Sequence, residues 1–191
     1  MSGTLDQATV QPSLPAALFS ALDLAVLDGC GIRNESDPDM PGCLYFYSEE
    51  GLGEFHGLLP AALVEADNSK LGLAINGYLK RQQIPYSCGD EFGDEIDLPG
   101  SVADWAVVFQ EAIKKSRVAG DGSPLNAGRN AADEIVIMGA FTADRMSPGD
   151  FGGYVVRITE RVLQREDTYS ALARMRDEAP PRRTGRKKAR K

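Results

Sequence analysis

Histidine and cysteine are the residue types best suited to nucleophilic chemistry, and this 191-residue chain contains one histidine and three cysteines. Cys88 and His56 could form a nucleophile–base pair, with Asp90 or Glu91 orienting the imidazole ring. The acidic neighbours of Cys88 work against such a pair, because negative charge disfavours the reactive thiolate. The sequence thus predicts no catalytic residue, with Cys88 and His56 as the weak candidates, and it favours a structural or surface role for His56.

Metal binding would require ligands at defined spacings. Cys30, Cys43, His56 and Cys88 carry zinc-binding atoms, yet the shortest gap between them holds twelve residues, whereas structural zinc sites draw their ligands from close pairs. The spacing of the acidic segment 90–97 fails the EF-hand pattern, which requires acids at alternate positions, a central glycine and a terminal glutamate. The sequence therefore predicts no metal.

A glycine-rich segment follows the aromatic stretch 43–47. Its spacing, Gly51-Leu52-Gly53 and then Gly57, is GxGxxxG rather than the GxGxxG of dinucleotide-binding loops. Neighbouring glutamates would also repel a pyrophosphate. We expect a flexible turn here and predict no cofactor.

Charge is segregated along the chain. Residues 1–181 contain all 28 Asp and Glu together with 14 of the 21 Lys and Arg, which gives a formal charge of −14. The last ten residues carry seven cations and no acid, which gives +7. An acidic body repels nucleic acid, whereas a basic segment attracts it.

Two groups of charged residues are the predicted binding sites. The expected contacts to nucleic acid or another polyanion lie in the basic tail: Arg182, Arg183, Arg186, Lys187, Lys188, Arg190 and Lys191. The expected patch for a basic protein partner consists of carboxylates: Glu49, Glu50, Glu54, Asp90, Glu91, Asp94, Glu95 and Asp97. The aromatic run Tyr45-Phe46-Tyr47 has acidic neighbours rather than interleaved cations, so the sequence assigns it to core packing and not to base stacking.

These observations favour a non-enzymatic accessory or regulatory protein, with an acidic surface for a protein partner and a tail that contacts nucleic acid or another polyanion. One alternative is an acidic inhibitor that imitates nucleic acid. A second is a hydrolase that uses Cys88/His56 or a carboxylate-bound metal. No apolar run reaches the ~18–20 residues that span a bilayer, and the odd cysteine count argues against a disulfide framework. We therefore expect a cytoplasmic protein without a membrane partner.

The elements that would position these residues indicate an α+β fold. Residues 1–12 are predicted to be flexible, residues 13–179 to form one acidic domain, and residues 180–191, which begin with Pro180-Pro181, to be a disordered basic tail. The domain is expected to contain a small, mostly antiparallel sheet packed by about four helices.

Individual segments carry clearer signals. Strands are predicted at 43–47, 134–141 and 154–159. Residues 34–42 are predicted to be a turn and residues 87–100 a loop. Three helices are predicted to follow the caps Ser13, Ser101 and Thr168; the first begins at Leu14 and is ended by Gly29, and the last runs through Met175. Residues 60–66 also have a helical pattern. For residues 70–83 a helical stripe competes with the hairpin signal Asn76-Gly77, and we favour the helix.

Overall fold

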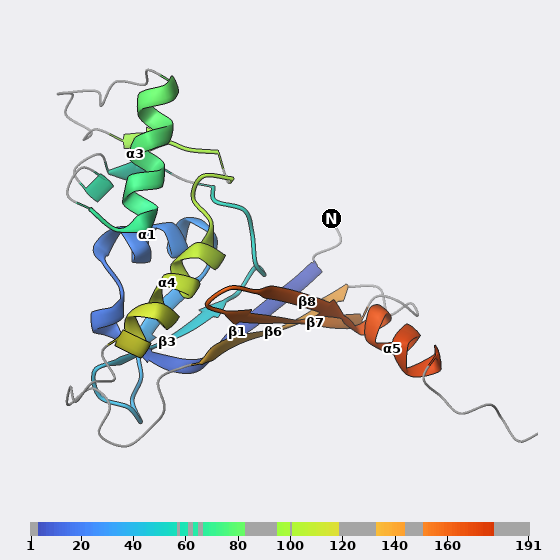
Figure 1. Ribbon diagram of the computed structural model, residues 1–191. Helices are drawn as coiled ribbons and strands as arrows, with labels where there is room; N and C mark the ends of the chain where they lie inside the picture. Colours follow the sequence, from blue (N-terminus) through green and yellow to red (C-terminus); the bar gives the residue numbers. More distant parts are fainter. Residues whose placement is uncertain are drawn as a thin grey trace, which may run out of the picture.

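A computed structural model describes residues 4–56, 58–60, 63–64, 67–82, 95–99, 101–118, 133–143 and 151–177. These residues form one α+β domain (Figure 1). Its main feature is a six-stranded antiparallel sheet with the strand order β2-β3-β1-β6-β7-β8, and a separate two-stranded sheet pairs β4 with β5. The predicted α+β class is confirmed.

The large sheet consists of β1 (Thr4–Pro15), β2 (Arg33–Ser36), β3 (Cys43–Ser48), β6 (Glu134–Ala143), β7 (Phe151–Thr159) and β8 (Leu163–Asp167). The small sheet consists of β4 (Leu58–Pro60) and β5 (Glu95–Asp97). The described part of the chain contains a short 3-10 helix, η1 (Ala16–Leu18), and four α-helices: α1 (Ala21–Gly29), α3 (Lys70–Gln82), α4 (Trp105–Val118) and α5 (Thr168–Asp177).

The N-terminal segment corrects the prediction that residues 1–12 are flexible. Residues 4–15 form β1, which lies inside the sheet and pairs with β3 on one side and β6 on the other. The signal is a period-two alternation, in which Ala8 and Val10 are buried while Gln7 and Thr9 are exposed. The hydrophobic signal of this alternation is weak, because many residues of the strand are small or polar.

The first helix begins later than predicted. The expected cap, Ser13, lies in β1, and α1 starts after Ser20. The Ser20 hydroxyl accepts a hydrogen bond from the Asp23 N–H, and the Asp23 carboxylate accepts one from the Ser20 N–H. This reciprocal capping box outcompetes Ser13, because it satisfies two backbone donors at once.

Other differences concern caps and short strands. The structure places β2 within a predicted turn and β5 within the predicted loop 87–100, and it adds β8. Helix α4 begins at Trp105, after the Asp104 carboxylate accepts from the Ala106 N–H, rather than after Ser101. Helix α5 is capped by Asp167, which accepts from the Ser170 N–H, and not by Thr168. Short, polar strands have little hydrophobic periodicity, so the sequence signals them weakly.

Several predictions are confirmed. Residues 70–82 are helical as α3, which decides between the helix and the hairpin. Strands β3, β6 and β7 contain the predicted 43–47, 134–141 and 154–159, and β6 pairs with β7 antiparallel.

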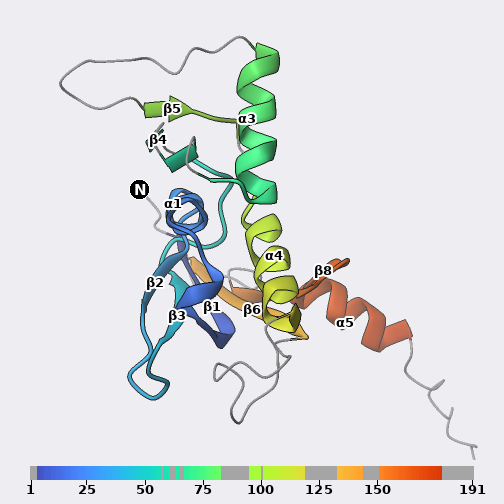
Figure 2. The ribbon, with the colours of Figure 1, turned by 60° about the vertical axis from the view of Figure 1, so that its left-hand side comes forward.

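The core lies between one face of the large sheet and the helices. Helices α1 and α4 pack on this face, and α3 with the β4–β5 pair forms a further layer beyond them (Figure 2). Phe46 of β3 packs against Phe19 and Phe109, with ring centroids 4.9 and 5.6 Å away. The Tyr154 ring covers Gly139 on the neighbouring strand, so the absence of a side chain there makes room for the ring.

Candidate functional site

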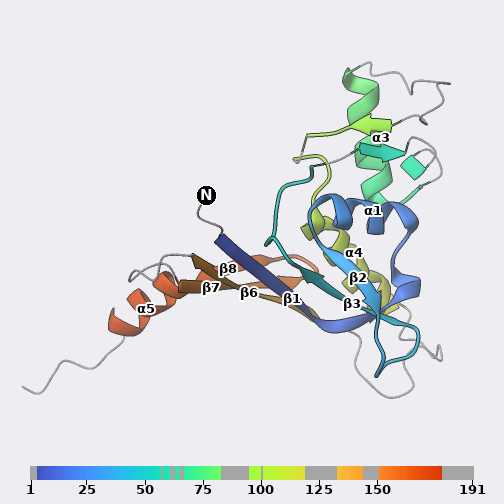
Figure 3. The same ribbon diagram turned by 180° about the vertical axis from the view of Figure 1, so that it is seen from behind.

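The two faces of the large sheet differ in what covers them. Side chains alternate along each strand, so those opposite the helices share a face that we call the open face. Seen from behind, the strands lie in front of a more distant α4 (Figure 3). Cross-strand pairs place seven neutral side chains on the open face: Thr9, Gln11, Tyr45, Tyr47, Val136, Met138 and Val155. Met138 and Val155 are 41% and 46% exposed, which is unusual for large apolar residues in the interior strands of a sheet.

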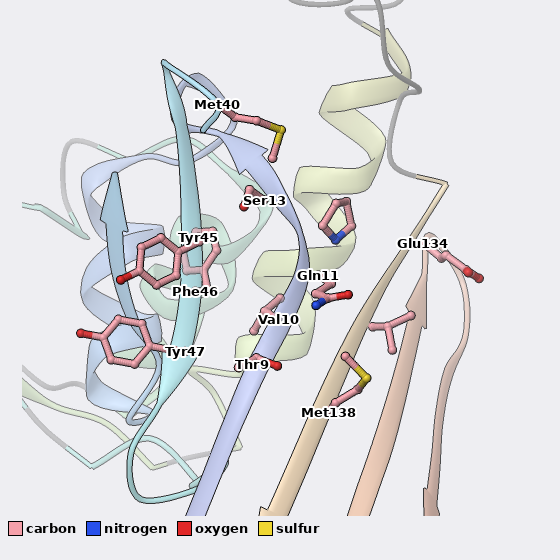
Figure 4. Close-up of a pocket in the computed structure, with 12 residues that line it drawn as sticks. Thr9, Val10, Gln11, Ser13, Met40, Tyr45, Phe46, Tyr47, Glu134 and Met138 are labelled. Carbon is pink, nitrogen blue, oxygen red and sulfur yellow. The ribbon is translucent and has the colours of Figure 1, made fainter. Parts of the chain in front are cut away.

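A depression of about 680 Å³ lies on the open face between β3, β1 and β6. It forms where the β1–β3 register shifts between Val10 and Leu14, because the intervening Pro12 has no N–H for the ladder. Tyr45 and Tyr47 form one wall, Met138 the opposite wall, and Met40 lies at one end (Figure 4).

A hydrogen-bonded cluster borders the depression. Tyr45 and Tyr47 stack with ring centroids 5.5 Å apart. Their hydroxyls donate to the two carboxylate oxygens of Glu35, at 2.7 and 2.8 Å. These hydrogen bonds lower the pKa of Glu35 and raise the pKa of Tyr45 to about 12. Glu35 is therefore held as an anion beside two oriented aromatic rings.

Further carboxylates follow Glu35 along the chain. Asp37 accepts hydrogen bonds from the backbone N–H groups of Asp39 and Met40, and its pKa is lowered by the Ser13 side chain and these N–H groups. Within the described residues, neither Glu35, Asp37 nor Asp39 forms an ion pair. This corner of the open face is therefore negative.

The other acid at the depression is compensated. Glu134 lines the far side, and the Arg157 Nε lies 2.6 Å from its carboxylate. The uncompensated negative charge of the open face is therefore concentrated beside the two tyrosines.

The predicted acidic patch is only partly brought together. Glu50 and Glu54 border one depression of about 470 Å³, together with Asp28 and His56. Glu49 forms an ion pair with Arg33 at 3.4 Å. Glu95 and Asp97 belong to β5, and Asp90, Glu91 and Asp94 lie outside the described residues.

The predicted chemical residues are not assembled within the described part of the chain. His56 is exposed, and its backbone N–H donates to the Gly29 carbonyl at 2.8 Å. Cys30 is buried, which raises the pKa of its thiol to about 11 and makes it a poor nucleophile. Cys88 lies outside the described residues, so the Cys88–His56 pair stays a prediction. Among the residues described, no three His, Cys, Asp or Glu side chains form a group that could hold a metal ion.

The carboxylate of Asp6 lies on the covered face of the sheet. Asp6 is next to Gly51, whose φ of 80° and close contact with that carboxylate both require glycine. Burial raises the pKa of Asp6, and the charge of Arg165 partly offsets this effect. Within the described structure, its Oδ1 atom is buried without a hydrogen-bond partner.

The basic tail, residues 182–191, lies outside the described residues, so its predicted role stays a prediction. In the described part of the chain, every helix is too short or too polar to cross a membrane.

The open face was not predicted from the sequence. Tyr45-Phe46-Tyr47 was expected to lie in the core as a unit, whereas only Phe46 of the three is buried there. The alternation of a strand could have separated the three residues, because neighbouring side chains must point to opposite faces. No such signal marks β6, where Ile135-Val136-Ile137-Met138 is continuously apolar and suggests burial on both sides.

No protein-family model, curated protein or solved structure matches this chain.

Proposed function

We propose that this chain is a non-enzymatic accessory or regulatory protein of the cytoplasm, which binds a protein partner on the open face of its sheet. The supporting observation is that one face of the large sheet packs against helices while the other presents tyrosines and methionines around a depression of about 680 Å³. Binding sites in proteins are typically concave and mostly apolar, with a few polar groups that fix orientation, and this depression has that character.

The residue types suit binding. Tyrosine supplies a large contact area with little loss of conformational entropy, and it is enriched in protein interfaces. Methionine adapts to differently shaped partners, because its side chain is unbranched and polarisable. The acidic corner adds selectivity for a basic surface, which keeps the expected charge preference of the partner but moves it to Glu35, Asp37 and Asp39.

The basic tail completes the proposal. Its seven cations would neutralise phosphates of nucleic acid or another polyanion, so that the partner is engaged close to such a molecule. The acidic body would limit this contact to the tail, because its own charge repels phosphates.

The open face can be tested by photo-crosslinking in extracts of the source cells. A benzoylphenylalanine at position 138 should give a discrete crosslinked protein, whereas the same residue at position 73, on the exposed side of α3, should not. Leu73 is a matched control because it is also a large exposed apolar residue, at 62%.

The captured partner is then purified and titrated by calorimetry. Met138→Lys should weaken its binding by about 30-fold, the size expected for an interface hot spot, and Leu73→Lys should leave it unchanged. Equal affinity of both variants would refute the open face as the binding surface.

The tail is tested separately by fluorescence polarisation with DNA and RNA at two salt concentrations. Replacing its seven Lys and Arg by Gln in the full-length chain should abolish most of the binding and flatten its salt dependence. Unchanged affinity would disprove the role of the tail without affecting the open face.

A further inference from the structure

We propose that the Tyr45–Tyr47–Glu35 cluster is a recognition site for an arginine side chain of the partner protein, flanked by an apolar residue that enters the depression. This inference rests on the proposed function, because it names the chemistry of the segment that the open face receives.

The geometry of the cluster fits a guanidinium group. Each oxygen of Glu35 accepts one tyrosine hydroxyl, which fixes the carboxylate plane and leaves a further lone pair on each oxygen. Arginine is the side chain that engages both oxygens of a carboxylate with parallel N–H groups. Its planar group also stacks on tyrosine rings.

The molecule already contains one arginine–tyrosine contact. The guanidinium carbon of Arg165 lies 4.7 Å from the ring centroid of Tyr154 on the covered face. Tyr45 and Tyr47 are half-buried and offer comparable rings, yet no cation lies over either of them within the described residues.

Charge complementarity identifies the partner as cationic. Glu35, Asp37 and Asp39 have no ion-pair partner in the described part of the chain, whereas the nearby Glu49 and Glu134 are paired with Arg33 and Arg157. Glu35 also stays ionised at a lower pH than an ordinary glutamate, because the tyrosine hydroxyls lower its pKa. An arriving arginine would therefore meet an anion at any physiological pH.

The remainder of the depression selects the neighbouring residue. Opposite the tyrosines the wall is formed by Met138, with Met40 at one end, and Val136 also lines the depression. An aliphatic side chain next to the arginine would fill this space and remove exposed apolar surface from water. The inferred motif is therefore an arginine beside a leucine-like residue.

The test uses two pentapeptide probes, acetyl-Gly-Leu-Arg-Leu-Gly-amide and the same peptide with citrulline in place of arginine. Citrulline has nearly the same shape but no charge. Binding to the full-length protein is followed by NMR, through the ring signals of Tyr45 and Tyr47. The arginine peptide should bind at least about tenfold more tightly than the citrulline peptide, as expected for a charge-assisted hydrogen-bonded pair.

Two variants separate specific recognition from general attraction. Glu35→Gln should remove the tenfold preference, while Glu49→Gln, which removes the same charge from a neighbouring exposed position, should keep it. Equal binding of both peptides to the unmodified protein would overturn the inference, as would equal effects of the two variants.

The remaining outcomes identify other occupants. Partner binding that is lost in Met138→Lys but unaffected by Glu35→Gln would preserve the proposed function and refute the arginine site. Self-association in sedimentation velocity that Met138→Lys abolishes would assign the face to a second copy of the chain. Peptide binding that appears only after the tail cations are replaced by Gln would show that the chain's own tail occupies the site, and would refute a partner's arginine.

Discussion

Tyr45 and Phe46 are neighbours in one strand, yet they belong to different environments. Phe46 is 1% exposed and packs against two other phenylalanines. Tyr45 is half-buried, and its hydroxyl donates a hydrogen bond to the exposed Glu35. The covered face of the sheet holds the domain together, and the open face is available for contacts with other molecules. We therefore expect stability to depend on the covered side of these strands and the proposed binding to depend on their open side, so that each can be altered separately.

The largest test of this division compares two truncations in β3. Phe46→Ala should destabilise the fold by about 3–5 kcal/mol, because it leaves a cavity in a packed core. Tyr45→Ala should cost less than about 1 kcal/mol, because the ring is partly in water. Urea unfolding followed by circular dichroism measures both. Similar costs would show that the open face is part of the folding core.

A glycine offers the next test. Gly139→Ala should destabilise the domain by about 1–3 kcal/mol, because the new methyl group would overlap the Tyr154 ring. Gly77→Ala in α3 is the matched control and should stabilise by about 0.5–1 kcal/mol, since its methyl group meets only the flexible end of Arg81. In thermal unfolding, the melting temperature should fall for Gly139→Ala and rise for Gly77→Ala. A neutral Gly139→Ala would contradict tight packing on the covered face.

Asp6 on the covered face is expected to make a smaller, pH-dependent contribution to the stability of the fold. Its pKa is raised above 3.8 in the folded state by burial, so folding favours the protonated carboxyl. The stability from this group is present below pH 3.8 and is lost as the pH rises through the folded pKa. Asp6→Asn should therefore raise the melting temperature at pH 7 and lose this advantage near pH 3. A constant difference across this pH range would exclude a titration of Asp6.

The smallest effect on stability is expected on the open face. Glu35→Gln removes the anion that raises the pKa of Tyr45 to about 12, so this pKa should fall towards its ordinary value of 10. An alkaline titration of phenolate absorbance measures the change, and the urea midpoint should barely move because Glu35 is exposed. Glu49→Gln should leave the Tyr45 pKa unchanged. A large loss of stability would show that the cluster is structural.

Sequence reasoning predicted the elements with strong periodicity and missed those built from pairing. Helix α3 and strands β6 and β7 have enough apolar residues at regular spacing to be recognised. Strand β2 has the sequence Arg-Asn-Glu-Ser and owes its conformation to hydrogen bonds with β3, which no local pattern encodes.

The candidate site escaped prediction for a related reason. Tyr45 and Tyr47 are adjacent to Phe46 in sequence, but they form a candidate binding site only together with Glu35 from β2 and Met138 from β6. These residues meet only through the strand order β2-β3-β1-β6, which brings together strands that are far apart in the sequence. Glu35, Asp37 and Asp39 are close together in the sequence, but no linear pattern places them beside the aromatic pair.

The interior position of β1 has a consequence for synthesis. Its residues Thr4 to Gln11 pair with Val136 to Ala143, so a ribosome makes β6 long after it has made β1. Until β6 emerges, one edge of β1 has no strand to bond with, and the sheet cannot close. During that interval the nascent chain carries an unpaired strand edge, which is the kind of surface that promotes aggregation before folding is complete.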